Sequence, residues 1–357
     1  MLFSRKQQLV GIDIGTHTVK LVQLKKAGKG YQLLNFGVMP LMPESIVDGT
    51  IANPSAVVEA IRNLVRMEKI KSKEVATAIS GQSVIVKKIR VPEMTDKELA
   101  ENIQWEAEQH IPFEISDVNI SFQRIPPTDM SNAAADGQTD VLLVAARKSK
   151  IEDYQNILIE SGLQPVVIDT DIFALENEYE VNNEVGYESV VVLVDIGAST
   201  TNINILKGNL TLFQRDIAIG GNMYTSTIRK ELSVTYEQAE NLKRGIGFDS
   251  NVGKDDVLPL MATVSEEICE EIQRSLEFFR STTADTTIEK MVLSGGCSLI
   301  KGLDQFLSSR LGLPVELANP FRNIQYSAKT FDPDYIQAMA PVAAVGIGLA
   351  LRRTNDA

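Results

Sequence analysis

Two segments of this 357-residue chain repeat one pattern that few folds accommodate. In each segment an apolar run ends in Asp-x-Gly, hydroxyl-bearing residues follow, and a second apolar run begins after the turn. The first copy reads Asp13-Ile14-Gly15-Thr16-His17-Thr18, and the second reads Asp195-Ile196-Gly197-Ala198-Ser199-Thr200-Thr201. Strand-like runs on both sides of a short turn predict a β-hairpin. The chain is therefore predicted to contain a duplicated β–turn–β unit, with an aspartate near the end of one strand in each copy.

The residues of these two turns suit a phosphate chain. Turns rich in Gly, Ser and Thr present backbone N–H donors without side-chain obstruction. Mg²⁺, which accompanies phosphates, prefers carboxylate and water oxygens, and Asp13 and Asp195 supply carboxylates. Two hairpins facing each other across a cleft are predicted to clamp the phosphates from both sides. A third turn, Ser294-Gly295-Gly296-Cys297-Ser298, offers a bare surface on which an adenine could lie.

Each of these turns also has an ordinary interpretation. A lone Asp-x-Gly is a turn in most proteins, and a lone Gly-Gly is usually a loop. Taken together, in this order and with these strand contexts, they resemble the phosphate-one, phosphate-two and adenosine motifs of the superfamily that contains actin, hexokinase and FtsA. The resemblance covers essentially the whole chain. It implies an α/β, actin-like ATPase fold, with two RNase H-like halves around a cleft that binds ATP and Mg²⁺.

The resemblance also implies roles for individual residues. It places a metal-linked carboxylate and a phosphate-binding lysine at Asp13 and Lys20, a glycine pair after the second hairpin, and a ribose- and adenine-contacting helix at Glu240 and Lys243. The cofactor-binding residues expected on this basis are Asp13, Gly15, Thr16, His17, Thr18, Lys20, Asp195, Gly197, Ala198, Ser199, Thr200, Gly220, Gly221, Glu240, Lys243, Gly295, Gly296, Cys297 and Ser298. Asp13 and Asp195 are expected to bind Mg²⁺ through water.

Two of these assignments compete with structural roles, and catalysis stays open. The spacing of Glu240 and Lys243 also suits an ordinary i,i+3 ion pair on the surface of a helix. Asp171 matches the acid that positions the attacking water in the superfamily, but it also suits the N-cap of a helix over Ile172–Glu180. Where FtsA-like proteins typically carry three glycines, the second hairpin reads Gly197-Ala198-Ser199. The sequence therefore favours ATP binding with at most slow hydrolysis.

A block between the two repeats has a different character. Residues 75–164 are predicted as an inserted subdomain of order strand–helix–strand–strand, with a capping box at Thr95-Asp96-Lys97-Glu98 and a flexible hairpin loop over Pro126–Thr139. The order resembles the extra subdomain of FtsA and of the PilM family of type IV pilus assembly proteins. The run from Ile103 to Phe113 resembles the helix and Ile-Pro-Phe turn of the PilM family. Its Trp105 is predicted to be a core residue.

The predicted organisation has seven parts. Residues 1–74 begin the first half, 75–164 are inserted, and 165–188 return to the first half with a linking helix. Residues 189–235 begin the second half, 236–289 form a helical subdomain over the nucleotide, and 290–340 continue the second half with the adenosine motif. A helix rich in small residues, over 341–357, is expected to return to the first half.

The resemblance to the PilM family implies a cytoplasmic ATP-binding scaffold of type IV pilus biogenesis. Such a protein binds the N-terminal tail of a PilN-like membrane protein and links it to the cytoplasmic motor. It would therefore lie at the cytoplasmic face of the inner membrane only indirectly, through partners. Pilus motor ATPases and self-association are further candidates. The groove for the tail is expected on the inserted subdomain.

Composition and charge exclude some classes and leave two alternatives. The net charge of −12 opposes binding to nucleic acid or anionic lipid, and two histidines with two cysteines are too few for a His- or Cys-based metal site. No membrane-spanning or signal segment is expected. An FtsA-like polymer is disfavoured because no amphipathic membrane helix follows the fold. A small-molecule kinase is disfavoured because no substrate domain is evident.

Overall fold

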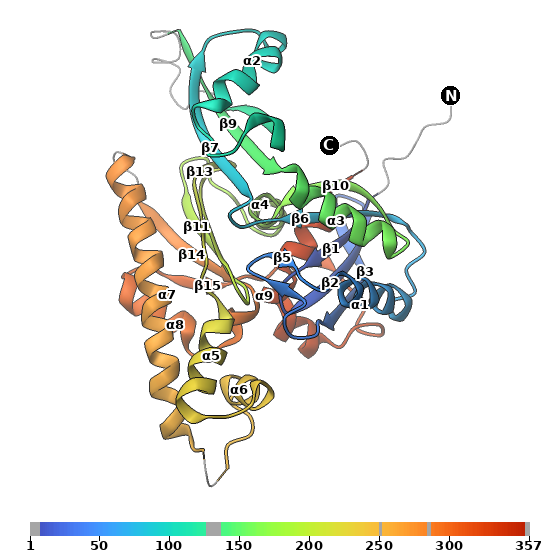
Figure 1. Cartoon of the computed structure of the whole chain (residues 1–357), viewed down its shortest axis with the longest axis vertical. Helices are drawn as coiled ribbons and strands as arrows, with labels where there is room; N and C mark the ends of the chain where they lie inside the picture. Colours follow the sequence, from blue (N-terminus) through green and yellow to red (C-terminus); the bar gives the residue numbers. More distant parts are fainter. Residues whose placement is uncertain (1–7, 126–136, 250–251, 284–286, 354–357) are drawn as a thin grey trace.

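Two large β-sheets with the same strand arrangement form the body of the protein (Figure 1). The computed structural model describes residues 8–125, 137–249, 252–283 and 287–353. The first sheet has the order β10-β6-β1-β2-β3-β16, and the second has the order β13-β12-β11-β14-β15. The strands of the first sheet are β1 (Val10–Ile14), β2 (Thr18–Ala27), β3 (Gly30–Pro40), β6 (Glu74–Ile79), β10 (Gln164–Thr170) and β16 (Ile324–Gln325). Those of the second are β11 (Val190–Ile196), β12 (Thr201–Lys207), β13 (Leu210–Ile217), β14 (Ile288–Ser294) and β15 (Val315–Leu317).

The pairing of the strands is duplicated as well. In the first sheet β1, β2 and β3 form an antiparallel meander, and β6 and β10 add in parallel beyond β1. In the second sheet β11, β12 and β13 form the meander, and β14 and β15 add in parallel. Asp13 pairs with Lys20 in the first register, and Asp195 pairs with Asn202 in the second. The predicted internal repeat is therefore confirmed, with Asn202 at the position that corresponds to Lys20.

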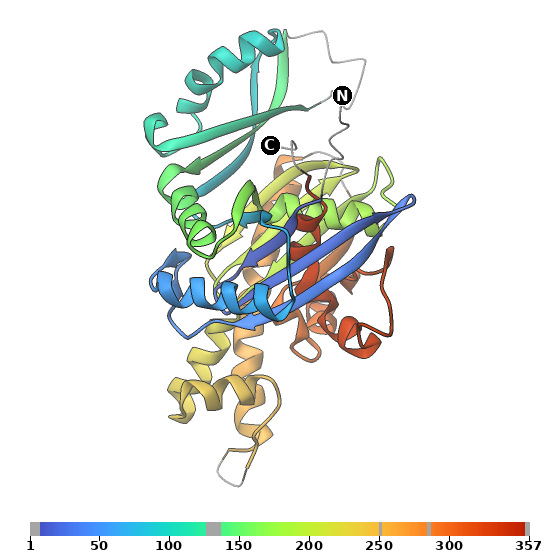
Figure 2. The same cartoon turned by 90° about the vertical axis from the view of Figure 1, so that its right-hand side faces the viewer.

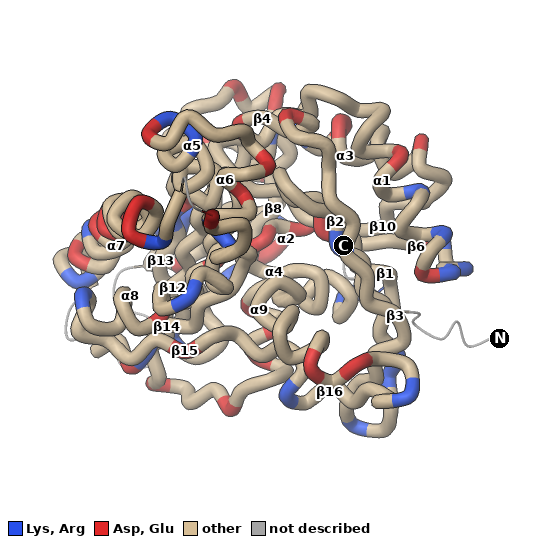
Figure 3. The backbone as a smooth tube through the Cα atoms, turned by 90° about the horizontal axis from the view of Figure 1, so that it is seen from below, with Lys and Arg blue, Asp and Glu red and all other residues tan. Residues whose placement is uncertain are grey.

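Two helices, α4 (Asp171–Asn182) and α9 (Pro333–Ala350), pack against each other between the two sheets (Figure 3). Their close approach depends on glycine in α9. A Cβ on Gly348 would stand 1.8 Å from the carbonyl oxygen of Ala174, and a Cβ on Gly11 of β1 would stand 2.5 Å from the carbonyl oxygen of Gly346. Since backbone cannot move aside as a side-chain end can, these glycines fix how closely α9 meets α4 and β1. The predicted small-residue helix is present and contacts the first half, but it begins at Pro333 rather than at residue 341 and ends at Ala350.

Helices also cover the outer faces of both sheets. On the first sheet lie α1 (Pro54–Met67) and α3 (Lys148–Glu160), next to a two-stranded ribbon of β4 (Ile46–Val47) and β5 (Thr50–Ile51). On the second lie α7 (Lys254–Thr282) and α8 (Leu303–Leu311), the latter after a 3₁₀ turn η2 (Gly296–Leu299). Helices α5 (Gly221–Leu232) and α6 (Tyr236–Lys243) pack on α7 and form a projecting helical group (Figure 1).

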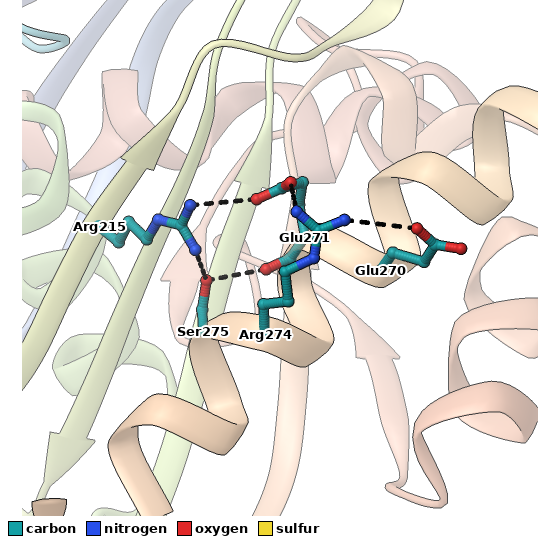
Figure 4. A network of polar contacts seen from close by, with 5 residues as sticks. All are labelled: Arg215, Glu270, Glu271, Arg274 and Ser275. Atoms are coloured by element: carbon teal, nitrogen blue, oxygen red, sulfur yellow. Dashed lines mark hydrogen bonds and ion pairs between the residues drawn. The ribbon is translucent and has the colours of Figure 1, made fainter.

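A charged network fastens α7 to the second sheet (Figure 4). The guanidinium of Arg215 on β13 donates to Ser275 Oγ at 3.0 Å and to Glu271 at 3.1 Å. Arg274 in turn bonds Glu271 at 2.5 Å and Glu270 at 3.4 Å. Glu271 is thus shared by two arginines. Arg215 joins β13 to α7, whereas the pairs of Arg274 lie within α7.

The inserted subdomain is smaller than the sequence indicated. Its own sheet has the order β7-β9-β8, formed by β7 (Val84–Pro92), β8 (Val118–Ile125) and β9 (Gln138–Arg147), with η1 (Ile115–Asp117) before β8. The predicted boundaries 75–164 were too wide, because β6 hydrogen-bonds between β1 and β10 in the first sheet and α3 packs on α1. The strand–helix–strand–strand order is confirmed over residues 84–147. Most of the predicted Pro126–Thr139 loop, residues 126–136, lies outside the described residues.

Helix α2 (Asp96–Glu108) covers one face of this small sheet. It begins with the predicted capping box, in which Thr95 and Glu98 satisfy each other's backbone N–H groups. Leu99, Ile103 and Ala107 are buried against the sheet at four-residue intervals. The prediction that Trp105 is a core residue was wrong. Its side chain is 63% exposed, because a position two residues from Ile103 lies on the opposite side of the helix.

Candidate nucleotide-binding site

The two Asp-x-Gly turns meet directly. Thr16 Oγ1 and Ser199 Oγ lie 2.7 Å apart, although they come from different halves of the chain. Both turns have the same internal geometry: Gly15 N–H donates to the Thr18 carbonyl at 3.1 Å, and Gly197 N–H donates to the Thr200 carbonyl at 2.9 Å. The predicted arrangement of two hairpins facing each other is thus present in the structure.

Backbone donors remain available in both turns. Within the part of the chain that the structure describes, the N–H groups of Thr16, His17, Ala198 and Ser199 donate to no protein atom. Successive N–H groups of this kind form a concavity that binds anions. Their turn residues are half-buried, as expected for a wall that is deep but still reaches solvent. The geometry therefore fits a phosphate-bearing ligand between the turns.

An excess of carboxylates surrounds a single lysine at this point. Lys20 Nζ lies 3.1 Å from Asp13 Oδ2, and their side chains are 16% and 12% exposed. Burial would lower the pKa of Lys20, but Asp13, Asp195 and Asp171 together raise it, so the ammonium stays charged. Burial raises the pKa of Asp195 to about 6, against the hydrogen bond that it accepts from Ser294 Oγ at 2.8 Å and the charge of Lys20.

The interpretation of Asp171 as an N-cap was wrong. The cap of α4 is Thr170, whose side chain accepts from the N–H of Phe173, and Asp171 is the first residue of the helix. This leaves its carboxylate directed into the cluster rather than occupied by the helix. Burial and the neighbouring charge of Asp13 raise the pKa of Asp171 to about 7, despite a hydrogen bond from Ser80. A carboxyl near half-protonation at neutral pH is able to accept or donate a proton.

Replacement of Asp171 by asparagine is expected to stabilise the protein at both pH 5 and pH 8, and by about 2 kcal/mol more at pH 8 than at pH 5. The folded-state pKa of about 7 lies above the ordinary value of 3.8, so the folded state binds a proton that the unfolded state releases between these values. The Asp171 carboxyl therefore lowers the free energy of unfolding by an increasing amount as pH rises from about 4 to 7. Urea unfolding of both proteins at the two pH values measures the difference. An equal change at pH 5 and pH 8 would contradict the assignment.

The second turn is continuous with the predicted glycine pair and adenosine turn. Gly221 N–H donates to the Gly197 carbonyl at 2.9 Å, and Cys297 Sγ donates to the same carbonyl at 3.3 Å. Gly220 comes so close to the turn that a Cβ there would lie 2.7 Å from Gly197 O. Gly295 has φ +86°, a conformation that favours glycine, and a Cβ on it would meet Ile196 O at 2.4 Å. Burial raises the pKa of the Cys297 thiol to about 12, which keeps it protonated.

Within the predicted adenosine turn, one residue is exposed and another is buried. Gly296 is exposed, with no atom within 4 Å of where its Cβ would stand, whereas Ser298 is buried and donates to the Gly295 carbonyl at 2.6 Å. The buried serine holds the shape of the turn, and the bare glycine leaves its surface open. A flat, unobstructed backbone of this kind suits contact with an aromatic base.

Glu240 and Lys243 on α6 do form an ion pair, at 2.5 Å, but not on the open surface. Their side chains are 15% and 13% exposed, and Lys243 Nζ also donates to Thr225 Oγ1 at 2.9 Å and to the Gly221 carbonyl at 3.4 Å. The hydrogen bond and charge of Lys243 outweigh burial and lower the pKa of Glu240. Lys243, and Glu240 through it, therefore lie beside the predicted glycine pair.

Two further contacts cross between the halves, and no sequence motif predicts either of them. Tyr236 OH on α6 lies 3.3 Å from His17 Nδ1 in the first turn. Asp216 on β13 accepts from Gly81 N–H at 2.8 Å, at the root of the inserted subdomain, and from Asn202 Nδ2 at 2.9 Å. Burial lowers the pKa of His17, so its imidazole is neutral at physiological pH. Ser294 belongs to the predicted third turn but was not among the expected cofactor-binding residues, and its hydroxyl donates to Asp195.

The acidic residues fit a metal only together with a ligand. Among the described residues, no group of three or more His, Cys, Asp or Glu side chains is placed to hold a metal ion. Asp13, Asp171 and Asp195 nevertheless outnumber the one lysine among them, and this balance of charge would favour a cation over a further anion. Carboxylates are ligands that suit Mg²⁺, which usually keeps several of its waters.

The fold and the paired turns define the class of the protein: it has the actin-like ATPase fold. The crystal structure of MreB5 of Spiroplasma citri bound to ADP shares this fold with a TM-score of 0.52 at 14% identity, over 96% of this chain and 94% of that one. FtsA of Helicobacter pylori is 26% identical over 204 residues, which is 50% of this chain. The chain covers 41% of the length of that FtsA.

A narrower assignment follows from two further comparisons. The family described as type IV pilus assembly protein PilM matches residues 11–354. A solved PilM–PilN type IV pilus biogenesis complex superposes with a TM-score of 0.85 at 31% identity, over 98% of this chain and 99% of that one. The chain belongs to the PilM family of type IV pilus assembly proteins. Among the helices that the structure describes, none is both long and apolar enough to cross a membrane.

Proposed function

We propose that this protein is an ATP-binding scaffold of type IV pilus assembly, whose cleft controls the binding of a PilN-like membrane protein. The observation that carries the nucleotide half of this proposal is the meeting of the two turns at Thr16 and Ser199, with free N–H groups on both sides. MreB5, which shares the fold, is named as bound to ADP. The proposed PilN-like partner is supported by the membership of this chain in the PilM family and by its similarity to the solved PilM–PilN complex.

The residues of the site divide by chemistry. The N–H groups of Thr16, His17, Ala198 and Ser199 would hold phosphate oxygens, and Lys20 would neutralise them. Asp13 and Asp195 would hold Mg²⁺ through water. Glu240 and Lys243 would bind the ribose and adenine, with the base on the Gly295-Gly296 turn. Two pairs of these side chains are in contact: Asp13 with Lys20, and Glu240 with Lys243.

Any hydrolysis by this cleft should be slow. Asp171 is the candidate for orienting water, since its pKa of about 7 suits proton exchange. Ala198 and Ser199 carry side chains where the superfamily often has glycine, and the Thr16–Ser199 hydrogen bond occupies the space between the turns. We therefore place turnover well below the roughly 1–100 s⁻¹ of kinases.

The inserted subdomain offers an apolar surface for the PilN-like tail. On the face of its sheet that α2 does not cover, Val86, Leu142 and Val144 are partly exposed and belong to none of the buried clusters. Val86 pairs directly with Val144, and Leu142 lies two residues before Val144 on the same face of β9. These three residues form one patch, called here the open sheet face. A short tail could place apolar anchors on such a patch or add a strand to the edge of β7 or β8.

Two connections link this subdomain to the cleft. At the start of β7, Gly81 N–H is held by Asp216 of the second half. At the end of β9, Arg147 lies 4.2 Å over the ring of Phe113, and Lys148 Nζ donates to the Ser116 carbonyl at 2.6 Å. Two residues further along, the buried Lys150 donates to the Gly49 carbonyl, and the negative charge of Asp171 acts on the Lys150 ammonium. Movement of either half would therefore reach the inserted subdomain.

Membrane association, in this proposal, is indirect and occurs through the PilN-like protein at the cytoplasmic face of the inner membrane. Pilus motor ATPases are further proposed partners. Self-association of the FtsA kind is the second candidate function, because FtsA matches half of the chain. A pelleting assay with ATP and Mg²⁺ separates the two, since only a polymer sediments.

Purified protein is expected to bind ATP with Mg²⁺, and Asp13→Ala or Asp195→Ala is expected to weaken that binding by about tenfold. Each change removes a carboxylate that would hold the metal through water. Calorimetric titration measures the Kd. The same titration in EDTA is the control, because removing an acid also lowers its repulsion of phosphate. Wild-type affinity in both variants, with Mg²⁺ present, would overturn the site.

A further inference from the structure

Trp105 is the single tryptophan of the chain, and it stands exposed on the outer side of α2. Its side chain is 63% exposed and belongs to none of the hydrophobic clusters, whereas Leu99, Ile103 and Ala107 of the same helix are buried. Helix α2 lies at one end of the molecule, on the side of the small sheet away from the second half (Figures 1 and 2). The fold therefore makes no use of this large aromatic side chain.

The residues around Trp105 are acidic or amide-bearing. On a helix, positions three and four residues away lie on the same side, and here they are Glu101, Asn102, Glu108 and Gln109, all exposed. Among the described residues, no lysine or arginine lies within 4.0 Å of the carboxylate of Glu101 or Glu108. The helix carries five acids, Asp96, Glu98, Glu101, Glu106 and Glu108, against one lysine.

We propose that this surface, the Trp105 face (Glu101, Asn102, Trp105, Glu108 and Gln109), docks a basic segment of a partner protein. A guanidinium or ammonium group stacks on an indole more favourably than on any other side chain, and carboxylates on both sides add charge complementarity. An exposed aromatic residue ringed by polar residues is also the usual composition of an interface hot spot. The occupant is a segment that carries arginine or lysine with apolar residues.

This docking surface is separate from the open sheet face. Trp105 lies above the side of the sheet that α2 covers, and Val86, Leu142 and Val144 lie on the other side. The two surfaces can therefore be occupied together. The inference goes beyond the proposed function, since the Trp105 face needs neither nucleotide nor the PilN-like tail.

The test uses a synthetic amphipathic peptide of arginine and leucine that contains no tryptophan, with its glutamate-for-arginine counterpart as a control. Because the protein has one tryptophan, any change in tryptophan emission comes from Trp105. We expect the basic peptide to shift this emission towards shorter wavelength, and the acidic peptide to leave it unchanged. Calorimetry gives the Kd for every variant, including Trp105→Ala, which lacks the fluorophore.

Trp105→Ala is expected to reduce the affinity for the basic peptide by about tenfold. The double change Glu101→Gln with Glu108→Gln is expected to reduce it by several fold. The matched control is Tyr187→Ala, which removes another aromatic residue, 91% exposed, outside the inserted subdomain. It should bind as the wild type does, and melting curves should show all variants folded. Unchanged emission at saturation, or binding by Trp105→Ala within twofold of wild type, would mean that the peptide binds the acidic protein non-specifically and would overturn the proposal.

Discussion

Replacement of Gly348 by alanine is expected to destabilise the protein by at least about 3 kcal/mol. In an ordinary helix the same change stabilises, because alanine has the higher helix propensity by about 1 kcal/mol. Here the added methyl would stand 1.8 Å from the carbonyl oxygen of Ala174 and 2.4 Å from its carbonyl carbon. These are backbone atoms of α4, so the two helices between the sheets must separate.

The matched control for this prediction is Gly346→Ala, two residues away in the same helix. A Cβ there meets a methyl of Val22 at 2.9 Å, and a side-chain end yields more easily than backbone. Urea unfolding followed by circular dichroism should order the proteins as wild type, Gly346→Ala and then Gly348→Ala. Since α4 begins with Asp171, the folded fraction of Gly348→Ala should also bind ATP more weakly. Equal stability of all three proteins would contradict the described crossing of α4 and α9.

Val144→Glu is expected to reduce the affinity for a PilN N-terminal peptide by at least about tenfold. Val144 is central to the open sheet face, where it pairs with Val86, and a carboxylate there would have to be desolvated under an apolar tail. Wild-type affinity should be modest, with a Kd on the order of micromolar, because the tail must be ordered on binding.

The control for charge is Gln104→Glu, which adds the same carboxylate on the exposed side of α2. It should bind the peptide like the wild type. Isothermal titration of the three proteins with one peptide provides the comparison. Wild-type affinity in folded Val144→Glu would mean that the tail does not bind the open sheet face. Loss of binding in Gln104→Glu would mean that the tail binds α2 instead.

The parts of the site that local chemistry determines could be predicted from the sequence. Asp13, Gly15, Asp195 and Gly197 belong to turns whose residue types determine their own conformation, and both turns formed and met. Asp216, by contrast, gave no local signal. Its importance arises because β13 places it against the N–H of Gly81, a contact between residues 135 positions apart. Only the assembled halves bring such pairs together.

Two errors have identifiable physical causes. Trp105 was predicted in the core because of its residue type, although the spacing of Leu99, Ile103 and Ala107 already placed it on the other side of the helix. The predicted block 75–164 was too wide because its first strand, β6, pairs with β1 and β10 in the first sheet. Its nearly continuous apolar run, buried throughout after Glu74, is typical of a central parallel strand.

Helix boundaries explain the remaining difference. Thr170 and Asp171 are both able to cap a helix, and sequence alone does not separate adjacent candidates. The structure assigns the cap to Thr170, so Asp171 is left to the carboxylate cluster. A shift of one residue thus changed the interpretation of a side chain from structural to chemical.

If the nucleotide cleft controls the inserted subdomain, ATP must change the affinity of the protein for its proposed tail. The experiment compares the Kd of the PilN N-terminal peptide for the wild-type protein without nucleotide and with saturating ATP and Mg²⁺. The contacts at Gly81–Asp216 and at Lys150 join the two regions. We therefore predict a change in peptide affinity of at least about fivefold, and by reciprocity the peptide should change the Kd of ATP by the same factor. Equal peptide affinity in both states, with ATP shown to be bound, would mean that the cleft does not control the inserted subdomain.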